Sequence, residues 1–226
     1  MKLLLFDIDG TLLNANGTGR RGIEQALSDT FGKPVTTEGI SFGGRTDLSI
    51  MRQILQANGI APSDRTIQKA LDAYEATVLS DVAPDDVKRL PGVSTLLNTL
   101  AEHPNVQLAL LTGNIRSMAF WKLQAVELDH HFPFGAFGCD HAKRHELPGK
   151  AVKRAKDHTG RSYIGSDVVI IGDTPNDIRC GRGIGAFSVA VCTGHSTRDD
   201  LASHQPHVLL NSLEDTDAFI KQVMHT

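Results

Sequence analysis

The sequence has few cysteines, few aromatic residues and no long hydrophobic run. Its three cysteines, Cys139, Cys180 and Cys192, are odd in number and unclustered, so they predict neither a disulfide framework nor a Cys-x-x-Cys metal site and favour a reducing compartment. The apolar start at residues 3–6 reaches acidic residues after about five positions, which is too short for a membrane span or a signal peptide. We therefore expect a soluble, cytoplasmic protein that has no membrane partner.

The chain also lacks an excess of charge of either sign. Lysine and arginine number 23 against 26 aspartates and glutamates, a net charge of −3, and this balance argues against a nucleic-acid partner. A hydrophobic content of 40% and a length of 226 residues suit one large domain, or a core with a smaller companion. Both a monomer and a homodimer are compatible with this composition.

The strongest motif is at the N-terminus, where the apolar run is followed by Asp7-Ile8-Asp9-Gly10-Thr11. A short, wholly apolar run is typical of a strand buried on both faces of a parallel sheet. Asp7 and Asp9 would follow its carboxyl end, where such sheets bind ligands, and their spacing starts both side chains on one side. Two close carboxylates need a cation or a proton. A plain Asp-Gly turn, the alternative, needs neither Asp7 nor Thr11.

Residues 15–87 differ from the rest because they show helical periodicity and little strand signal. Apolar residues recur there at three-to-four spacing in three groups, separated by breaks that contain glycine and proline: Ile23, Ala26, Leu27 and Phe31; Ile50, Ile54 and Leu55; Ile67, Leu71, Tyr74 and Val78. We expect this segment to be an all-helical cap domain. It leaves the chain directly after the acidic turn, so it should lie over the site.

The remaining residues, 1–14 and 88–226, alternate between apolar runs and helical segments. After the first strand, strands are predicted at 106–111, 136–138, 167–171, 187–191 and 208–210, and helices at 93–102, 115–125, 147–158, 176–183 and 213–223. This alternation predicts an α/β core with a doubly wound parallel sheet, into which the helical cap is inserted.

Two further strand ends carry polar residues. The hydroxyl of Thr112 and the amides of Gly113 and Asn114 could hold a phosphate at a helix N-terminus, although ordinary helix capping is the favoured explanation when these three residues are viewed alone. Asp173 and Asp177 follow another strand, and a capped, solvated helix start is the alternative there. Two acid clusters at strand ends favour a shared site, and hard oxygen ligands of this kind suit Mg²⁺.

These elements resemble, in order and over nearly the whole chain, the four motifs of the haloacid dehalogenase superfamily of phosphotransferases. The resemblance implies that Asp7 is the nucleophile that becomes an aspartyl-phosphate. It implies that Asp9 is the acid/base, with its backbone carbonyl on Mg²⁺. A carboxylate is ionised at neutral pH and can attack phosphorus, and an acid two residues away can pass a proton in each half-reaction.

The resemblance also assigns the other strand ends. Thr112 matches the phosphate-binding residue of the second motif, beside Gly113 and Asn114. Asp173 and Asp177 match the acids of the fourth motif, so the implied magnesium ligands are Asp7, Asp9, Asp173 and Asp177.

The third motif is a basic residue that holds the nucleophile and the phosphate. Residues 140–150 lack the usual Lys-Pro pair. We favour Arg144 because its spacing to the following helix matches best, and Lys143 and Lys150 stay open as alternatives. Arginine binds phosphate bidentately, so the replacement is chemically reasonable.

In the cap, the glycine-rich segment from Phe42 to Asp47 resembles the specificity loop of small-molecule phosphatases that have an inserted helical cap. Arg45 there could reach the phosphate or an acidic leaving group of the substrate, or could form a surface salt bridge. Arg20, near the first hinge, is a second and weaker candidate.

The resemblance therefore implies a Mg²⁺-dependent phosphatase of a small phosphorylated metabolite, in the branch that contains phosphoglycolate phosphatase. A phosphomutase of the β-phosphoglucomutase type is the alternative, and a non-catalytic binding protein on the same core is less favoured. A haloacid dehalogenase is disfavoured because those enzymes lack the acid that Asp9 supplies here.

Overall fold

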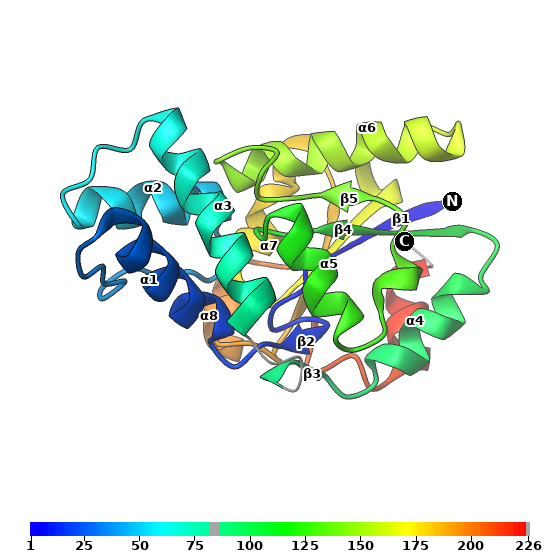
Figure 1. The fold of residues 1–226 in the computed structure, drawn as a ribbon. Coiled ribbons are helices and arrows are strands. Elements are labelled where there is room, and N and C mark those ends of the chain that lie inside the picture. Colours follow the sequence, from blue (N-terminus) through cyan, green and yellow to red (C-terminus); the bar gives the residue numbers. More distant parts are fainter. Residues whose placement is uncertain (82–85, 225–226) are drawn as a thin grey trace.

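A computed structural model describes residues 1–81 and 86–224 of the chain. Their central feature is a parallel six-stranded sheet in the order β5-β4-β1-β6-β7-β8 (Figure 1). Its strands are β1 (Lys2–Phe6), β4 (Val106–Leu111), β5 (Gly135–Ala136), β6 (Val168–Gly172), β7 (Phe187–Val191) and β8 (Val208–Leu210). The predicted α/β class with a doubly wound parallel sheet is confirmed.

Strand β1 lies at the centre of the sheet, hydrogen-bonded to β4 on one side and to β6 on the other. All five of its residues are buried. Leu4 and Phe6 pack into one hydrophobic cluster, and Leu3 and Leu5 pack into another on the opposite face. This alternation is what a strand covered by helices on both faces requires.

Helices cover both faces of the sheet. The cluster around Phe6 includes residues of α4 (Val93–Ala101), α5 (Arg116–Gln124) and α9 (Thr216–Met224). The cluster around Leu5 includes residues of α6 (Leu147–Thr159) and α7 (Pro175–Cys180). The short helix α8 (Arg198–Ser203) adds Leu201 to a small cluster with Ile178 and Ala190.

Three helices are inserted after β1: α1 (Thr18–Phe31), α2 (Asp47–Ala57) and α3 (Asp64–Asp81). They form a group beside the sheet (Figure 1) and share a hydrophobic cluster of their own, which also takes in Ile115 and Met118 of the core. The division into a core of 1–14 and 88–226 and a cap of 15–87 remains our proposal. Residues 82–85 of that cap lie outside the described residues.

Some boundaries differ from the prediction. An antiparallel pair of two-residue strands, β2 (Leu13–Asn14) and β3 (Lys88–Arg89), flanks the insertion and was not predicted. The helix expected to reach residue 183 ends at Cys180, because glycines follow and favour the short 3₁₀ turn at Arg182–Ile184. In the described ranges, no helix is long and apolar enough to cross a membrane.

Candidate active site

The site lies where three neighbouring strands end. Because β1 is placed between β4 and β6, the residues that follow them, Asp7, Thr112 and Asp173, meet at one edge of the sheet. The Asp7 amide continues the ladder by donating to the carbonyl of Ile171, at 2.9 Å. The parallel topology thus brings together residues that are up to 166 positions apart (173 − 7).

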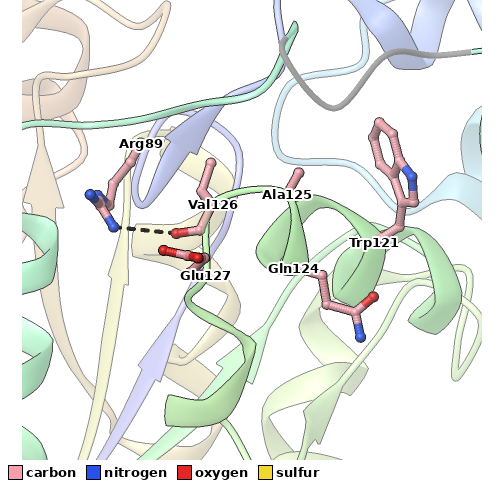
Figure 2. Close-up of a pocket in the computed structure, with 6 residues that line it drawn as sticks. All are labelled: Arg89, Trp121, Gln124, Ala125, Val126 and Glu127. Carbon is pink, nitrogen blue, oxygen red and sulfur yellow. Dashed lines mark hydrogen bonds between the residues drawn. The ribbon is translucent and has the colours of Figure 1, made fainter.

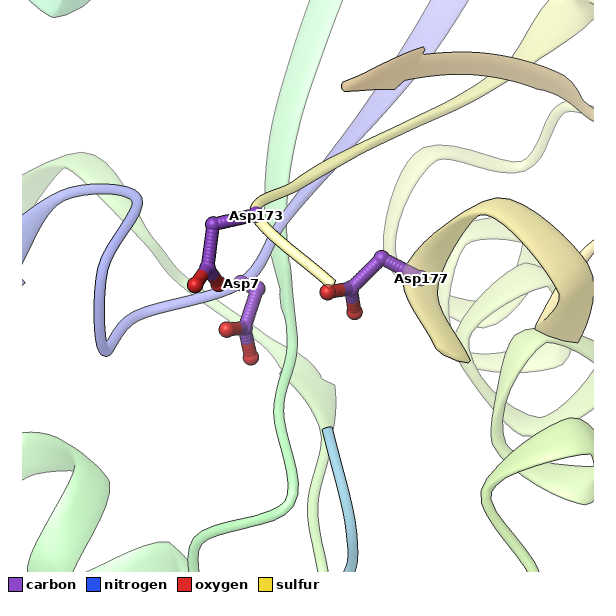
Figure 3. Close-up of side chains that lie close together, drawn as sticks. All are labelled: Asp7, Asp173 and Asp177. Atoms are coloured by element: carbon purple, nitrogen blue, oxygen red, sulfur yellow. The ribbon is translucent and has the colours of Figure 1, made fainter. Parts of the chain in front are cut away.

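Three buried carboxylates form the centre of the site (Figure 3). One oxygen each of Asp7, Asp173 and Asp177 lies within 4.8 Å of the other two. Oδ1 of Asp173 is buried and has no hydrogen-bond partner among residues 1–81 and 86–224. A Cβ on Gly10, whose φ is +79°, would stand 2.5 Å from Oδ2 of Asp173, so glycine is what allows the turn and the carboxylate to approach this closely.

Arg144 is the buried cation of this group. Its Nη2 donates to Oδ1 of Asp7 at 2.9 Å, to the carbonyl of Leu111 at 3.3 Å and to Oδ1 of Asp177. Of the three basic residues considered from the sequence, the structure brings only Arg144 to the carboxylates, whereas Lys143 and Lys150 are exposed.

One arginine does not balance three acids. Burial, together with the charges of Asp177 and Asp9, raises the pKa of Asp7 to about 7 in spite of the opposing effect of Arg144. Burial and the charges of Asp177 and Asp7 raise the pKa of Asp173 to about 9. The site therefore favours either protons or an added cation.

Asp177 also caps α7. Its Oδ2 accepts from the amide and the hydroxyl of Thr174, at 3.0 and 2.6 Å, and Thr174 Oγ1 in turn accepts from the Asp177 amide. Helix capping and membership of the acidic group are thus combined in one residue. Because both Asp177 oxygens already accept hydrogen bonds, Asp7 and Asp173 offer the more available ligand atoms.

Asp9 stands apart from the buried carboxylates. Its side chain is 44% exposed, and both of its oxygens accept from Nζ of Lys122, at 2.9 and 2.8 Å. Sequence reasoning missed Lys122. The available signal was a lysine on the α5 face that is otherwise made of Met118, Ala119 and Leu123, where a charged residue needs a partner.

The segment after β4 connects these groups to the cap. Thr112 Oγ1 accepts from the amide and from Nδ2 of Asn114, at 3.2 and 2.8 Å. The carbonyl of Gly113 accepts from the Asp47 amide at 2.7 Å, and a Cβ on Gly113 would stand 1.8 Å from the carbonyl oxygen of Arg45. The absent side chain therefore permits direct contact between the cap loop and the end of β4.

Arg45 and Arg20 line the cavity, but their guanidinium groups donate hydrogen bonds to other residues of the inserted segment. The guanidinium of Arg45 donates to the carbonyls of Ser41 and Ser49 and to Oε1 of Gln53. That of Arg20 donates to Thr37 and to the carbonyl of Ile40, and lies 4.3 Å from the ring centroid of Phe42. The surface salt bridge considered for Arg45 is not observed among the described residues.

A cavity of about 830 Å³ lies between the carboxyl ends of the strands and the inserted helices. Its lining includes Asp7, Asp9, Arg20, Arg45, Thr112, Gly113, Asn114, Lys122, Arg144 and Asp173, whereas Asp177 is not part of it. A second hollow, of about 670 Å³, lies near β3 and the end of α5 (Figure 2). There Arg89 donates to the carbonyl of Val126 at 3.3 Å. That hollow is lined by none of the predicted site residues.

Comparison with known proteins agrees with this arrangement. The model of the haloacid dehalogenase-like hydrolase family matches residues 4–191. Pyrophosphatase PpaX of Anoxybacillus flavithermus is 25% identical over 219 residues, which cover 94% of this chain and 93% of that protein. Phosphoglycolate phosphatase of Aliivibrio fischeri is 26% identical over 215 residues, 92% of each chain. A hydrolase from Pseudomonas syringae shares the fold, with a TM-score of 0.74 at 19% identity over 99% of both chains.

Proposed function

Because the chain belongs to the haloacid dehalogenase-like hydrolase family, we propose that it is a phosphatase that hydrolyses a small phosphorylated metabolite through an aspartyl-phosphate on Asp7. The observation that carries the proposal is the meeting of Asp7, Asp173 and Arg144 at the carboxyl edge of the sheet, beneath the cavity. The phosphatase names of the curated relatives support it.

In the first proposed step, a carboxylate oxygen of Asp7 attacks phosphorus, and the bond from phosphorus to the leaving-group oxygen breaks. Asp9 gives its proton to that oxygen, so an alcohol leaves. Asp9, now a carboxylate, then takes a proton from water, whose oxygen attacks the aspartyl-phosphate. The bond between phosphorus and Asp7 breaks, inorganic phosphate leaves, and both aspartates return to their starting state.

Arg144 and the segment after β4 would hold the phosphate during both steps. Arg144 is in contact with Asp7, so its guanidinium is placed to bind the phosphoryl oxygens as well as the nucleophile. Thr112, with the amides of Gly113 and Asn114, follows the neighbouring strand β4. These groups present positive charge and hydrogen-bond donors where the phosphoryl group acquires negative charge.

The acidic group fits a magnesium ion. Asp173 has a buried oxygen without a partner in the described part of the chain, and burial together with neighbouring carboxylates raises the pKa of both Asp7 and Asp173. Asp7 and Asp173 would be the direct carboxylate ligands, and Asp177 would act directly or through water. Bound there, Mg²⁺ would offset the repulsion between the nucleophile and the phosphate dianion.

The cavity and the cap support a small anionic substrate. The names of the two curated relatives specify phosphoglycolate and pyrophosphate, both of which leave an anion after the phosphoryl group is removed. Arg20 and Arg45 line the cap side of the cavity and could bind such a group. Cys139, Cys180 and Cys192 are free thiols, which supports the proposed cytoplasmic location.

The experiment is a phosphate-release screen over phosphorylated metabolites, in Mg²⁺ and in EDTA, with Asp7→Asn and the exposed variant Asp72→Asn beside the wild type. We expect magnesium-dependent release from a small phosphoester, lost in Asp7→Asn and kept in Asp72→Asn. Phosphate release that persists in Asp7→Asn would exclude Asp7 as the nucleophile. Interconversion of phosphorylated sugars without phosphate release would replace the phosphatase with a mutase.

A further inference from the structure

Lys122 is a buried lysine at the wall of the cavity. Its side chain is 6% exposed, and its Nζ lies within hydrogen-bond distance of three oxygens: Oδ1 and Oδ2 of Asp9, at 2.9 and 2.8 Å, and Oδ1 of Asn114, at 2.7 Å. An ammonium group donates up to three hydrogen bonds and accepts none. All of its donor capacity is therefore used on these two residues, and none is left to bind a phosphate.

Asn114 completes the same arrangement. Its Oδ1 accepts from Lys122, which fixes the orientation of the amide, and its Nδ2 donates to Oδ2 of Asp9 and to the hydroxyl of Thr112, each at 2.8 Å. Lys122 thus contacts Asp9 directly and also orients the second donor to Asp9. The three residues come from α5, from the segment after β4 and from the turn after β1.

These contacts leave about one lone-pair site of the Asp9 carboxylate free. A carboxylate has about four lone-pair sites, and three hydrogen bonds from Lys122 and Asn114 occupy all but about one of them. The side chain of Asp9 is nevertheless 44% exposed and lines the cavity. The carboxylate is held on the side of the core and open on the side where a substrate would enter.

We propose that Lys122 is a positioning residue that, together with Asn114, fixes the carboxyl group of Asp9 in the orientation needed for proton transfer to the leaving group. This inference rests on the proposed function, in which Asp9 is the acid/base. A displacement of about 1 Å in a catalytic group can cost ~100-fold in rate. Loss of the hydrogen bonds from Lys122 to Asp9 should therefore have a measurable effect on the rate. Lys122 acts on the reaction only through Asp9 in this proposal, because its donors are already used on Asp9 and Asn114.

The alternative is that Lys122 serves only the stability of the core. Asp9 would then be a partner that prevents a buried charge from being unpaired. The two roles differ in their dependence on the substrate. A structural defect slows all phosphate esters alike, whereas a displaced proton donor slows only those esters whose leaving group must receive a proton.

The test compares kcat/KM for two esters, because this ratio reports the steps up to departure of the leaving group. One ester is the alkyl phosphate with the fastest release in the screen above. The other is p-nitrophenyl phosphate, whose leaving group departs without a proton. The variants are Lys122→Met, which removes the charge at similar volume, Lys122→Arg, which keeps the charge, and Lys153→Met, which removes an exposed lysine of α6.

For Lys122→Met we expect a loss of ~100-fold or more on the alkyl phosphate and of less than ~10-fold on p-nitrophenyl phosphate. Lys122→Arg should recover part of the first loss, and Lys153→Met should match the wild type on both esters. In an Asp9→Asn background, Lys122→Met should cause less than a ~3-fold further change, because its partner is already inactive.

Equal losses on the two esters, or an undiminished effect in the Asp9→Asn background, would overturn the inference. If Lys122→Met does not fold, as judged by circular dichroism, Lys122→Gln is measured by the same criteria. Failure of the wild type to hydrolyse any phosphate ester would instead overturn the proposed function. An active wild type with a fully active Lys122→Met would leave that function standing and remove only the role of Lys122.

Discussion

The buried carboxylates of Asp7 and Asp173 make the free energy of unfolding depend on pH in the absence of a metal ion. Burial raises the pKa of Asp7 to about 7 and that of Asp173 to about 9, whereas both are near 4 in an unfolded chain. Above about pH 4 the folded protein therefore keeps protons that the unfolded chain has released. The stabilisation from these protons is complete below about pH 4 and is lost as the pH rises through 7 and then 9.

The size of the effect follows from the number of protons. Each retained proton costs ~1.4 kcal/mol of unfolding free energy per pH unit. One proton retained between about pH 5 and pH 7 thus lowers the stability by ~3 kcal/mol, which is ~5–10 °C in Tm for a chain of this length. The other of the two buried acids, Asp7 and Asp173, lowers the unfolding free energy further as the pH rises.

Magnesium should reverse this trend, because it binds the ionised carboxylates of the folded protein only. The assay is thermal unfolding in EDTA and in MgCl₂ at several values between about pH 5 and pH 8. We expect the difference in Tm between the two conditions to increase with pH. In EDTA near pH 8, Asp173→Asn should be more stable than the wild type, and it should respond weakly to Mg²⁺. The same pH slope in EDTA and in MgCl₂ would refute the reasoning.

Two other predictions concern neighbouring contacts. Arg144→Met leaves Asp7 and Asp177 without their buried counter-charge. It should lower the unfolding free energy by ~3–5 kcal/mol in denaturant titrations and kcat/KM by at least ~100-fold in phosphate-release assays. Unchanged values in both assays would contradict the role given to this ion pair. Gly113→Ala places a Cβ 1.8 Å from the carbonyl oxygen of Arg45, so amide hydrogen exchange in the loop at residues 42–46 should accelerate. Gly149→Ala is the control: among the described residues, no atom outside its own stretch of helix α6 lies within 4 Å of the new Cβ, so it should exchange like the wild type.

The parts of the fold that could be predicted are those specified by local pattern. The apolar runs of β1, β4, β6 and β7 are wholly or mostly buried strands, and their parallel arrangement follows from the helices between them. The β2–β3 pair has two residues in each strand, which is too short to produce a periodic signal. It forms because the two ends of the inserted segment return to the same place.

Part of the candidate site could likewise be predicted from the sequence, and part of it could not. The meeting of Asp7, Thr112 and Asp173 was predictable, because strand ends in a parallel sheet share an edge. The contact of Lys122 with Asp9 was not, because it depends on how α5 is rotated against the sheet. The direction of Arg45 also could not be predicted, since it is decided by nearby acceptors of its own loop and helix: the carbonyls of Ser41 and Ser49 and the side chain of Gln53.

Asp7 and Asp9 are separated by one residue, yet the fold gives them different surroundings. The Asp7 side chain is 8% exposed and is paired with Arg144, and that of Asp9 is 44% exposed and is paired with Lys122. Ile8 between them is fully buried, and its carbonyl accepts from the three amides of residues 11–13, which fixes the turn. A nucleophile needs one oxygen held against the phosphoryl site, whereas an acid/base must reach both a leaving group and water. Unequal environments for two neighbouring acids are how proteins separate such roles, and this inequality supports the proposed assignment of Asp7 as nucleophile and Asp9 as acid/base.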